Sequence, residues 1–362
     1  MKRNNLSTPQ MASKGNPLIS VVMPVYNRER YVADTIRSIL NQTYSPLELI
    51  VVVDNGSKDN SAGIVHDMAA SDNRVRPIYL SHGSQWRARN AGVAMACGDY
   101  IAHMDDDDIA LPERLTDQLA WMHQTGVDIC GGCIKKFGAE NGIIWFPETH
   151  QAICHELVFR IGILLPTVLM RANIARAHPY DETLVYSDYA MLTRIAHQYR
   201  LGNMPQILVK CCYHDQQIHI VDGAAFKSDE CLYRQPYVRS LFPEATSGDY
   251  EAIARVAEKK PFNNMADLKR AGNWLARLAQ TPDNFLRQRM ADRWQSACMR
   301  SAHLGLDCYR LYKQIAPQFG IPVASHLWKL KTACAFQLKT GSRREVFLRK
   351  IWNIGRHAVE IT

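Results

Sequence analysis

The sequence lacks a long apolar segment. Its longest largely apolar run covers about ten residues, 161–170, and contains a glycine and a proline. A membrane-spanning helix needs roughly 20 apolar residues, so we expect no transmembrane helix. The first sixteen residues are polar and lack the apolar middle of a secretory signal. We therefore expect a disordered tail over residues 1–16 and a cytoplasmic protein.

The ten cysteines have no regular spacing, and no secretory signal precedes them. Because disulfides are rare in reducing compartments, free thiols are the favoured interpretation. The pairs Cys130–Cys133 and Cys211–Cys212 leave a zinc site open as an alternative, since thiolates at such spacing can share a metal. The wide separation of the two pairs in the sequence disfavours it.

The length of 362 residues and the 47% hydrophobic content predict a globular chain of two domains. Short apolar runs alternate with amphipathic segments from residue 18 to residue 213. This alternation is typical of an α/β fold, with a doubly wound, mainly parallel sheet and helices on both faces. The expected strands are 18–25, 47–54, 75–80 and 100–104, and the expected helices are 29–41, 59–70, 85–96 and 112–124.

Strand patterns disappear after residue 221, where helical periodicity takes over. We therefore expect a sheet domain over 17–221 and a helical C-terminal domain over 222–362. The segment from residue 329 onward carries a net charge of +6 out of the chain's formal +8. The basic charge of the chain is thus concentrated at its C-terminal end.

Apolar and basic residues interleave in the last part of the chain. Phe347, Ile351 and Ile354 share one face of an expected helix that also carries Arg349 and Lys350. A basic amphipathic helix of this kind can lie in a membrane interface, which would place the protein on the inner face of the cytoplasmic membrane. The alternative is a terminal helix packed on its domain with a solvated basic face.

Polar residues follow three of the expected strands. Tyr26 comes after the first, Asp54 ends the second, and Asp105 to Asp108 follow the fourth. Ligands of open α/β sheets bind outside the carboxyl ends of the strands. A carboxylate there can accept from a base imide or a ribose hydroxyl, and an aromatic ring can cover the base. Alternatively, residues 54–57 are only a turn that caps the next helix.

Four consecutive aspartates after an apolar strand repel one another unless a cation neutralises them. Mg²⁺ and Mn²⁺ prefer oxygen ligands and commonly bridge a carboxylate to a diphosphate, so the pattern predicts a divalent metal ion. The alternative is an exposed acidic loop in front of a helix N-terminus.

Several motifs follow one another in an order that resembles family 2 glycosyltransferases. The resemblance covers roughly residues 17–215 and implies a GT-A fold, a nucleotide-sugar donor and inverting transfer. The segments that carry it are Met23-Pro24-Val25-Tyr26-Asn27-Arg28, Val53-Asp54-Asn55-Gly56-Ser57-Lys58-Asp59, Ala88-Arg89-Asn90-Ala91-Gly92, Gly98-Asp99-Tyr100-Ile101, and Met104-Asp105-Asp106-Asp107-Asp108-Ile109 with Leu111-Pro112.

The resemblance implies a role for each matched residue. Asp107 is implied as the metal ligand of the DxD motif, with Asp105 and Asp106 near the ribose. The residues implied around the base are Pro24, Tyr26, Asp54 and Arg89. The sequence departs from the family at Asn55, where a second aspartate is usual. An amide still forms hydrogen bonds, so base binding is expected to survive in altered form.

The segment 181–189 resembles the family segment that supplies the catalytic base, and it implies Asp188 in that role. Ser187 stands where a glutamate is usual, so Asp188 is the only carboxylate of that pair. The alternative is an ordinary acid in the first turn of a helix. His214 resembles a histidine that approaches the metal or the diphosphate, although a lone histidine is more often a hydrogen-bonded surface or core residue.

The expected function is inverting transfer of a sugar, with UDP as the expected nucleotide, to a hydroxyl of a glycan or lipid-linked acceptor in surface polysaccharide or lipopolysaccharide synthesis. Mn²⁺ or Mg²⁺ is the expected cofactor, and nucleic acid is not among the expected partners. A sugar nucleotidyltransferase is one alternative, but residues 24–28 supply no glycine-rich loop for a triphosphate. A non-catalytic glycan-binding relative is the other, which the intact Asp105, Asp107 and Asp188 disfavour.

Overall fold

The computed structural model describes residues 16–213, 223–322, 327–342 and 344. Its contacts divide the chain into two compact units. Unit 1 comprises Met1–Ile144, Leu164–Thr183 and Gln206–Asp215, and unit 2 comprises Trp145–Ile163, Leu184–Pro205 and Gln216–Thr362. Two segments that we expected in the first domain, 145–163 and 184–205, therefore belong to unit 2. The expected basic amphipathic tail and His214 lie outside the described residues.

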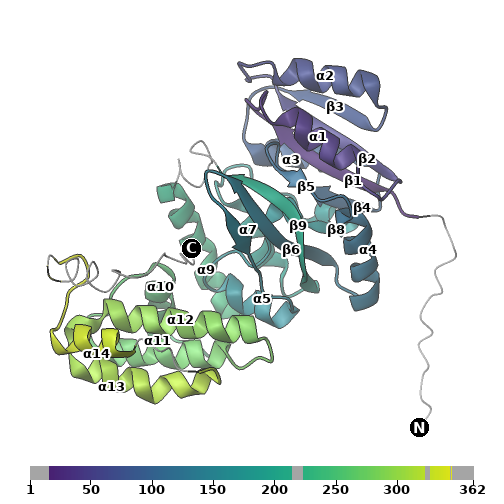
Figure 1. The fold of residues 1–362 in the computed structure, drawn as a ribbon. Helices are drawn as coiled ribbons and strands as arrows, with labels where there is room; N and C mark the ends of the chain where they lie inside the picture. Colours follow the sequence, from purple (N-terminus) through teal and green to yellow (C-terminus); the bar gives the residue numbers. More distant parts are fainter. Residues whose placement is uncertain (1–15, 214–222, 323–326, 343, 345–362) are drawn as a thin grey trace, which may run out of the picture. The chain divides into compact units, whose positions relative to one another are not determined.

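Within the described residues, nine strands form one sheet in the order β3-β2-β1-β4-β8-β6-β9-β5, with β7 paired to β6 (Figure 1). The strands β3, β2, β1 and β4 are parallel neighbours, whereas β8 pairs antiparallel with both β4 and β6. The α/β fold expected from the sequence is confirmed. The strands are β1 (Ile19–Val25), β2 (Leu47–Asp54), β3 (Val75–Leu80), β4 (Tyr100–His103), β5 (Ile109–Ala110), β6 (Ile129–Gly138), β7 (Gly142–Ile144), β8 (Leu169–Arg171) and β9 (Leu201–Tyr213).

Helices cover both faces of the parallel part of the sheet. As a result, all eight residues of β2 are buried. The helix α3 packs on β1 and β2, while α1 and α2 pack side by side and contact β2. The helical segments of unit 1 are α1 (Val32–Leu40), α2 (Ser61–Ser71), α3 (Gln85–Met95), α4 (Arg114–Thr125), η1 (Leu165–Thr167) and α6 (Ala172–Ala177).

Unit 2 is built mainly from helices, as the sequence predicts for the C-terminal region. Its helix α11 buries one apolar face. Asp283 caps the N-terminus of α12, where its side chain accepts a hydrogen bond from the Leu286 amide at 2.9 Å. No described helix has the length and apolar character needed to cross a bilayer. The helical segments are α5 (His150–Leu157), α7 (Ser187–Ile195), α9 (Gly223–Leu241), α10 (Ser247–Ala257), α11 (Met265–Leu278), α12 (Asn284–Arg300), η2 (Ala302–Leu304), α13 (Leu306–Ile315), η3 (Ala316–Phe319) and α14 (Leu327–Ala335).

Gly92 allows α3 to approach the sheet closely. A Cβ atom at this position would lie 2.5 Å from Cγ1 of Val22 and 3.1 Å from Cγ2 of Val52. Both valines belong to buried strands, so neither side chain has room to move away. The glycine of the 88–92 motif is therefore required by packing.

We expect Gly92→Ala to destabilise the protein by about 1–3 kcal/mol, because the added methyl group overpacks the contact between α3 and the sheet. The measurement is the midpoint of urea unfolding. Gly63→Ala on α2 is the matched control, since the nearest atom to its Cβ is the end of the flexible Asn60 side chain. Equal midpoints for the two variants would contradict the packing argument.

Candidate functional site

The parallel strands β1, β2 and β4 bring the predicted polar residues to one edge of the sheet. Asp54 is the last residue of β2, Tyr26 directly follows β1, and Asp105 lies two residues beyond β4. Because β1 lies between β2 and β4, the three strand ends are adjacent. Pro24 lies within β1, opposite Val52 of β2. The convergence expected from the sequence is thus present in unit 1.

The loop after β1 is tied to the aspartate segment. The Tyr26 amide donates to Oδ2 of Asp106 at 3.0 Å. Arg28 Nε lies 3.2 Å from Oδ2 of Asp107 and 3.3 Å from Oδ1 of Asp106. Asn27 adopts a left-handed conformation, with φ of 53°, which turns the chain so that Arg28 faces the aspartates. Sequence reasoning missed this role of Arg28, although the residue belongs to the first motif.

His82 is a second residue that sequence reasoning missed. Its Nδ1 lies 2.9 Å from Oδ2 of Asp54, and its ring centroid lies 5.2 Å from that of Tyr26. Asp54 also accepts from the amides of Gly56 and Gly83 at 2.7 and 3.2 Å. His82 follows β3, and the polar residues predicted from the sequence follow only the other three parallel strands. Asp54 is therefore held in place, and two exposed rings lie beside it.

Arg89 lies beneath the aspartates and is only 1% exposed. Its guanidinium forms an ion pair with Asp105 and donates to the Met104 carbonyl at 3.5 Å. NH1 also lies 3.4 Å from Nδ1 of His103. The buried Nε of Arg89 has no hydrogen-bond partner among the described residues. Arg89 thus neutralises Asp105 from below; its role beside the base stays a prediction.

His103, at the end of β4, is fully buried between two cations. Burial lowers its pKa well below the ordinary value, and the charges of Arg89 and Arg114 lower it further. The imidazole is therefore neutral near pH 7. Its Nε2 lies 3.1 Å from the Tyr180 hydroxyl. This hydrogen bond joins β4 to the segment that follows α6.

Asn90 connects the 88–92 motif to the same segment. Its Nδ2 donates to the Tyr180 carbonyl at 2.9 Å, and its Oδ1 accepts from the Tyr180 amide at 2.9 Å. Nδ2 also lies 3.1 Å from Oε1 of Glu182. The Asn90 side chain thus holds the backbone of Tyr180 in place. Tyr180 directly precedes residues 181–189, which resemble the family segment that supplies the catalytic base.

The four aspartates differ in their environments. Asp105 pairs with Arg89, Asp106 and Asp107 pair with Arg28, and Asp108 accepts from the Cys212 amide at 2.9 Å. The sequence argument treated these carboxylates as unpaired, and that premise was wrong. Burial, followed by the charge of Asp107, nevertheless raises the pKa of Asp106 to about 8. The four carboxyl groups outnumber the two arginines that contact them, and without a cation Asp106 holds a proton near pH 7.

This excess of carboxyl groups over arginines fits a divalent cation. Asp105, Asp106 and Asp107 supply oxygen donors, and they outnumber Arg28 and Arg89. A metal ion such as Mg²⁺ is often held by one or two carboxylates plus substrate phosphates. Within the described part of the chain, no group of three or more His, Cys, Asp or Glu side chains has the arrangement of a metal site by itself.

Asp188 lies in the first turn of α7, in unit 2. It is 8% exposed, and its Oδ1 accepts from the Tyr189 amide at 2.8 Å. Ser187, where the family usually has a glutamate, is fully buried. The assignment of Asp188 as the base stays a prediction. Asn55, which stands where the family usually has a second aspartate, is exposed. Its backbone amide donates to the Leu80 carbonyl at 2.8 Å.

Comparison with known proteins gives a consistent result. The profile described as glycosyl transferase family 2 matches residues 20–197. The O-antigen biosynthesis glycosyltransferase WbnJ of Escherichia coli is 31% identical over 55% of this chain and 81% of its own. An uncharacterized glycosyltransferase of Haemophilus influenzae is 31% identical over 56% of this chain and 67% of its own.

A similar fold is found among solved structures. S. aureus TarS 1-349 in complex with UDP-GlcNAc has a TM-score of 0.52 and 14% identity, and the match covers 84% of this chain and 91% of TarS. At this level of identity the likeness concerns the fold.

We expect Asp106→Asn to flatten the loss of stability at alkaline pH. The pKa of Asp106 is raised from an ordinary 3.8 to about 8, so the folded protein binds a proton that the unfolded chain releases. The stability that this proton contributes is fully present below pH of about 4 and is lost as the pH rises through about 8. In thermal melts with EDTA from pH 6 to 9.5, the wild type should lose several degrees more than Asp106→Asn.

The exposed carboxylate of Asp34, which pairs with Arg37 on the surface, provides the control variant Asp34→Asn. That variant should follow the wild-type pH profile. Parallel profiles for the wild type and Asp106→Asn would contradict the raised pKa.

Proposed function

The chain belongs to glycosyltransferase family 2, and from this premise we propose that it transfers a sugar from a nucleoside diphosphate donor to a hydroxyl group of a glycan or lipid-linked acceptor, with inversion at the anomeric carbon. The observation that carries the proposal is the meeting of Tyr26, Asp54 and the aspartate segment at the ends of three adjacent strands. The similarity to WbnJ, an O-antigen biosynthesis glycosyltransferase, supports a role in surface polysaccharide or lipopolysaccharide synthesis.

The base of the donor is proposed to bind at Asp54. A carboxylate offers about four lone-pair sites, and three hydrogen bonds to Asp54 come from Gly56, His82 and Gly83. One site is left for the imide N–H of a uracil, and the exposed ring of Tyr26 can stack on the base. UDP is therefore the nucleotide that we propose, and UDP-GlcNAc is the donor in the TarS complex.

The diphosphate of the donor is proposed to lie over the aspartate segment, with Asp107 as the ligand of Mg²⁺ or Mn²⁺ and with Asp105 and Asp106 near the ribose. A divalent cation bound there stabilises the negative charge that develops as the diphosphate leaves. Arg28 contacts Asp106 and Asp107, so it orients the two carboxylates and adds positive charge beside them. Arg89 orients Asp105 in the same way and adds positive charge beside it from the buried side.

Asp188 is proposed as the general base that accepts the proton of the acceptor hydroxyl. Inverting transfer is a single displacement in which the hydroxyl oxygen bonds to the anomeric carbon while the bond to the diphosphate breaks. A buried carboxylate whose Oδ1 is held by the Tyr189 amide has a fixed orientation, which suits a proton acceptor. Ser187 cannot share this task because a hydroxyl is not a carboxylate base.

We expect nucleotide sugars to stabilise the wild type thermally only when Mn²⁺ or Mg²⁺ is present, and Asp107→Ala to remove that stabilisation together with transfer. The reason is that the variant loses the carboxylate proposed to link the cation to the diphosphate. A panel of nucleotide sugars with and without metal measures this and identifies the donor. Asp67→Ala, at an exposed position of α2, is the control. Metal-dependent stabilisation that persists in Asp107→Ala would refute the metal assignment.

We expect Asp188→Asn to lower turnover by roughly 10² to 10⁴ while the affinity for the donor stays within about twofold, because only proton transfer is lost. Single-turnover transfer and donor titration separate these effects. Asp181→Asn is the control, since Asp181 is the other aspartate of the segment and accepts from the Thr183 amide at 2.9 Å. If Asp181→Asn shows the larger loss of turnover, the base has been assigned to the wrong residue.

A further inference from the structure

Unit 2 contains a fully buried carboxylate that is surrounded by arginines. Glu156, at the end of α5, has 0% side-chain exposure. Its Oε1 lies 2.7 Å from Nε of Arg160, 3.1 Å from NH2 of Arg293 and 4.0 Å from Nε of Arg289. Burial alone would raise the pKa of Glu156, but the charges of the three arginines outweigh it and the net shift is downward. We call Arg160, Arg289 and Arg293 the arginine cluster.

Each guanidinium of the cluster also stacks on an aromatic ring. Arg160 lies 5.8 Å from the ring centroid of Phe146, and Arg293 lies 4.3 Å from that of Phe159. Arg289 lies 4.9 Å from the Phe285 ring on the preceding turn of α12. These rings fix the planes of the guanidinium groups without contributing a formal negative charge.

The N–H groups of the cluster are not fully used. Nη2 of Arg160 and Nε of Arg293 are buried and have no hydrogen-bond partner among the described residues, whereas Nε of Arg160 faces Glu156 at 2.7 Å. Oε2 of Glu156 is likewise buried without a hydrogen-bond partner there. An unsatisfied buried N–H destabilises the folded protein, and the cost is larger when the group is charged. The side chains of all three arginines nevertheless keep between 16% and 27% of their surface exposed. The cluster therefore has donors to offer and a face open to solvent.

Positive charge exceeds negative charge around the cluster. Three arginines face two carboxylates, Glu156 and Asp292, and Gln288 donates to Asp292 at 2.9 Å. Burial, followed by the charge of Arg160, lowers the pKa of Arg289 to about 10. A single arginine would suffice to neutralise Glu156. A purely structural ion pair does not explain why three guanidinium groups are held together despite their mutual repulsion.

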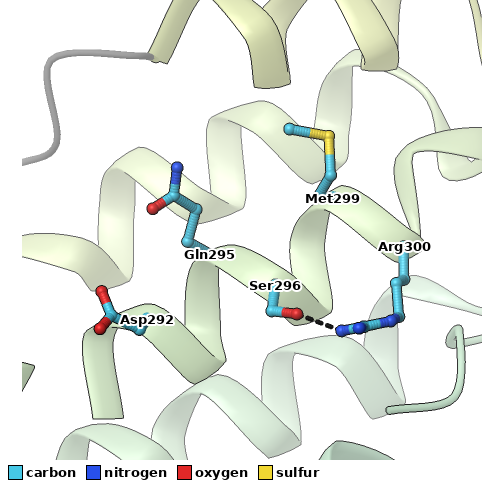
Figure 2. Close-up of a pocket in the computed structure, with 5 residues that line it drawn as sticks. All are labelled: Asp292, Gln295, Ser296, Met299 and Arg300. Atoms are coloured by element: carbon cyan, nitrogen blue, oxygen red, sulfur yellow. Dashed lines mark hydrogen bonds between the residues drawn. The ribbon is translucent and has the colours of Figure 1, made fainter. Parts of the chain in front are cut away.

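A pocket adjoins this region on α12. It has a volume of about 310 Å³, and Figure 2 shows Asp292, Gln295, Ser296, Met299 and Arg300 around it. Asp292 also interacts electrostatically with Arg289 and Arg293, so it connects the pocket to the cluster. Four of the five lining side chains are polar. The pocket can therefore receive a hydrogen-bonding group attached to an anion that the arginines hold.

We propose that the arginine cluster binds the phosphate group of a phosphate ester, whose remaining part occupies the pocket on α12. Guanidinium groups present their N–H donors in a planar fork that matches the oxygens of phosphate. A phosphate would supply the missing negative charge and accept from the guanidinium groups on the exposed face of the cluster. This site uses only residues of unit 2, and the proposal does not depend on the proposed donor site in unit 1.

The test is isothermal titration of the full chain with inorganic phosphate and, separately, with glucose 1-phosphate. UDP and Mn²⁺ are present at saturation, so that the donor site does not contribute. We expect Arg289→Gln to weaken binding at least tenfold. Arg289 lies farthest from Glu156, so its replacement leaves the carboxylate paired with Arg160 and Arg293. Arg310→Gln removes the same charge from an exposed position on α13 and should bind as the wild type does.

Tighter binding of glucose 1-phosphate than of inorganic phosphate would support the proposal in full. Equal binding that still depends on Arg289 would support the phosphate site and overturn the role of the pocket. Absence of saturable binding to the wild type, or equal affinity in Arg289→Gln, would overturn the proposal. Arg289→Lys retains the charge without the fork and should bind with intermediate affinity, which keeps the test valid if Arg289→Gln does not fold. Titration of UDP into wild-type protein prepared with the metal but without UDP reports separately on the proposed donor site.

Discussion

The chain must hold four consecutive carboxylates, Asp105 to Asp108, at the end of a buried strand, and much of unit 1 is arranged around their electrostatic cost. Neighbouring carboxylates in a poorly solvated site cannot all be charged without compensation. Arg28 reaches them from the loop after β1, and Arg89 reaches them from α3. Because these arginines come from different elements, the loop, the helix and the strand must be placed together before any one of them is stable.

The electrostatic cost of the aspartates also shapes the buried layer of residues beneath them. Arg114, at the start of α4, is 1% exposed and donates to the His103 carbonyl at 2.9 Å and to the Val168 carbonyl at 3.3 Å. Burial lowers its pKa to about 10, although the nearby carboxylates, Asp108 and Asp105 among them, act in the opposite direction. With Arg89 and Arg114 on either side, His103 has to be neutral. The buried layer under the aspartates thus supplies positive charge without exposing it to solvent.

Much of the fold could be predicted because apolar runs and amphipathic helices have distinct periods. The strand β2 matches the expected range 47–54 at both ends, and Asp54 lies where that range places it. The partners of the aspartates could not be predicted, since an arginine in a loop or helix is usually solvated. Strands β6 and β8 were not predicted, because glycines and lysines interrupt the apolar pattern of β6 and β8 is only three residues long. The interleaved units depend on contacts between distant segments, about which local patterns carry no information.

The two units show opposite imbalances of charge, and each imbalance has a chemical meaning. In unit 1, carboxylates outnumber the arginines that face them; in unit 2, arginines outnumber the carboxylates. Such imbalances are costly in a partly buried site, and removing one partner of a balanced pair would cost several kcal/mol. A site that keeps an imbalance is therefore arranged for a ligand of the opposite sign. Under the two proposals above, a cation with a diphosphate would satisfy the first imbalance and a phosphate would satisfy the second, so one chain would hold two phosphorylated ligands by opposite electrostatic means.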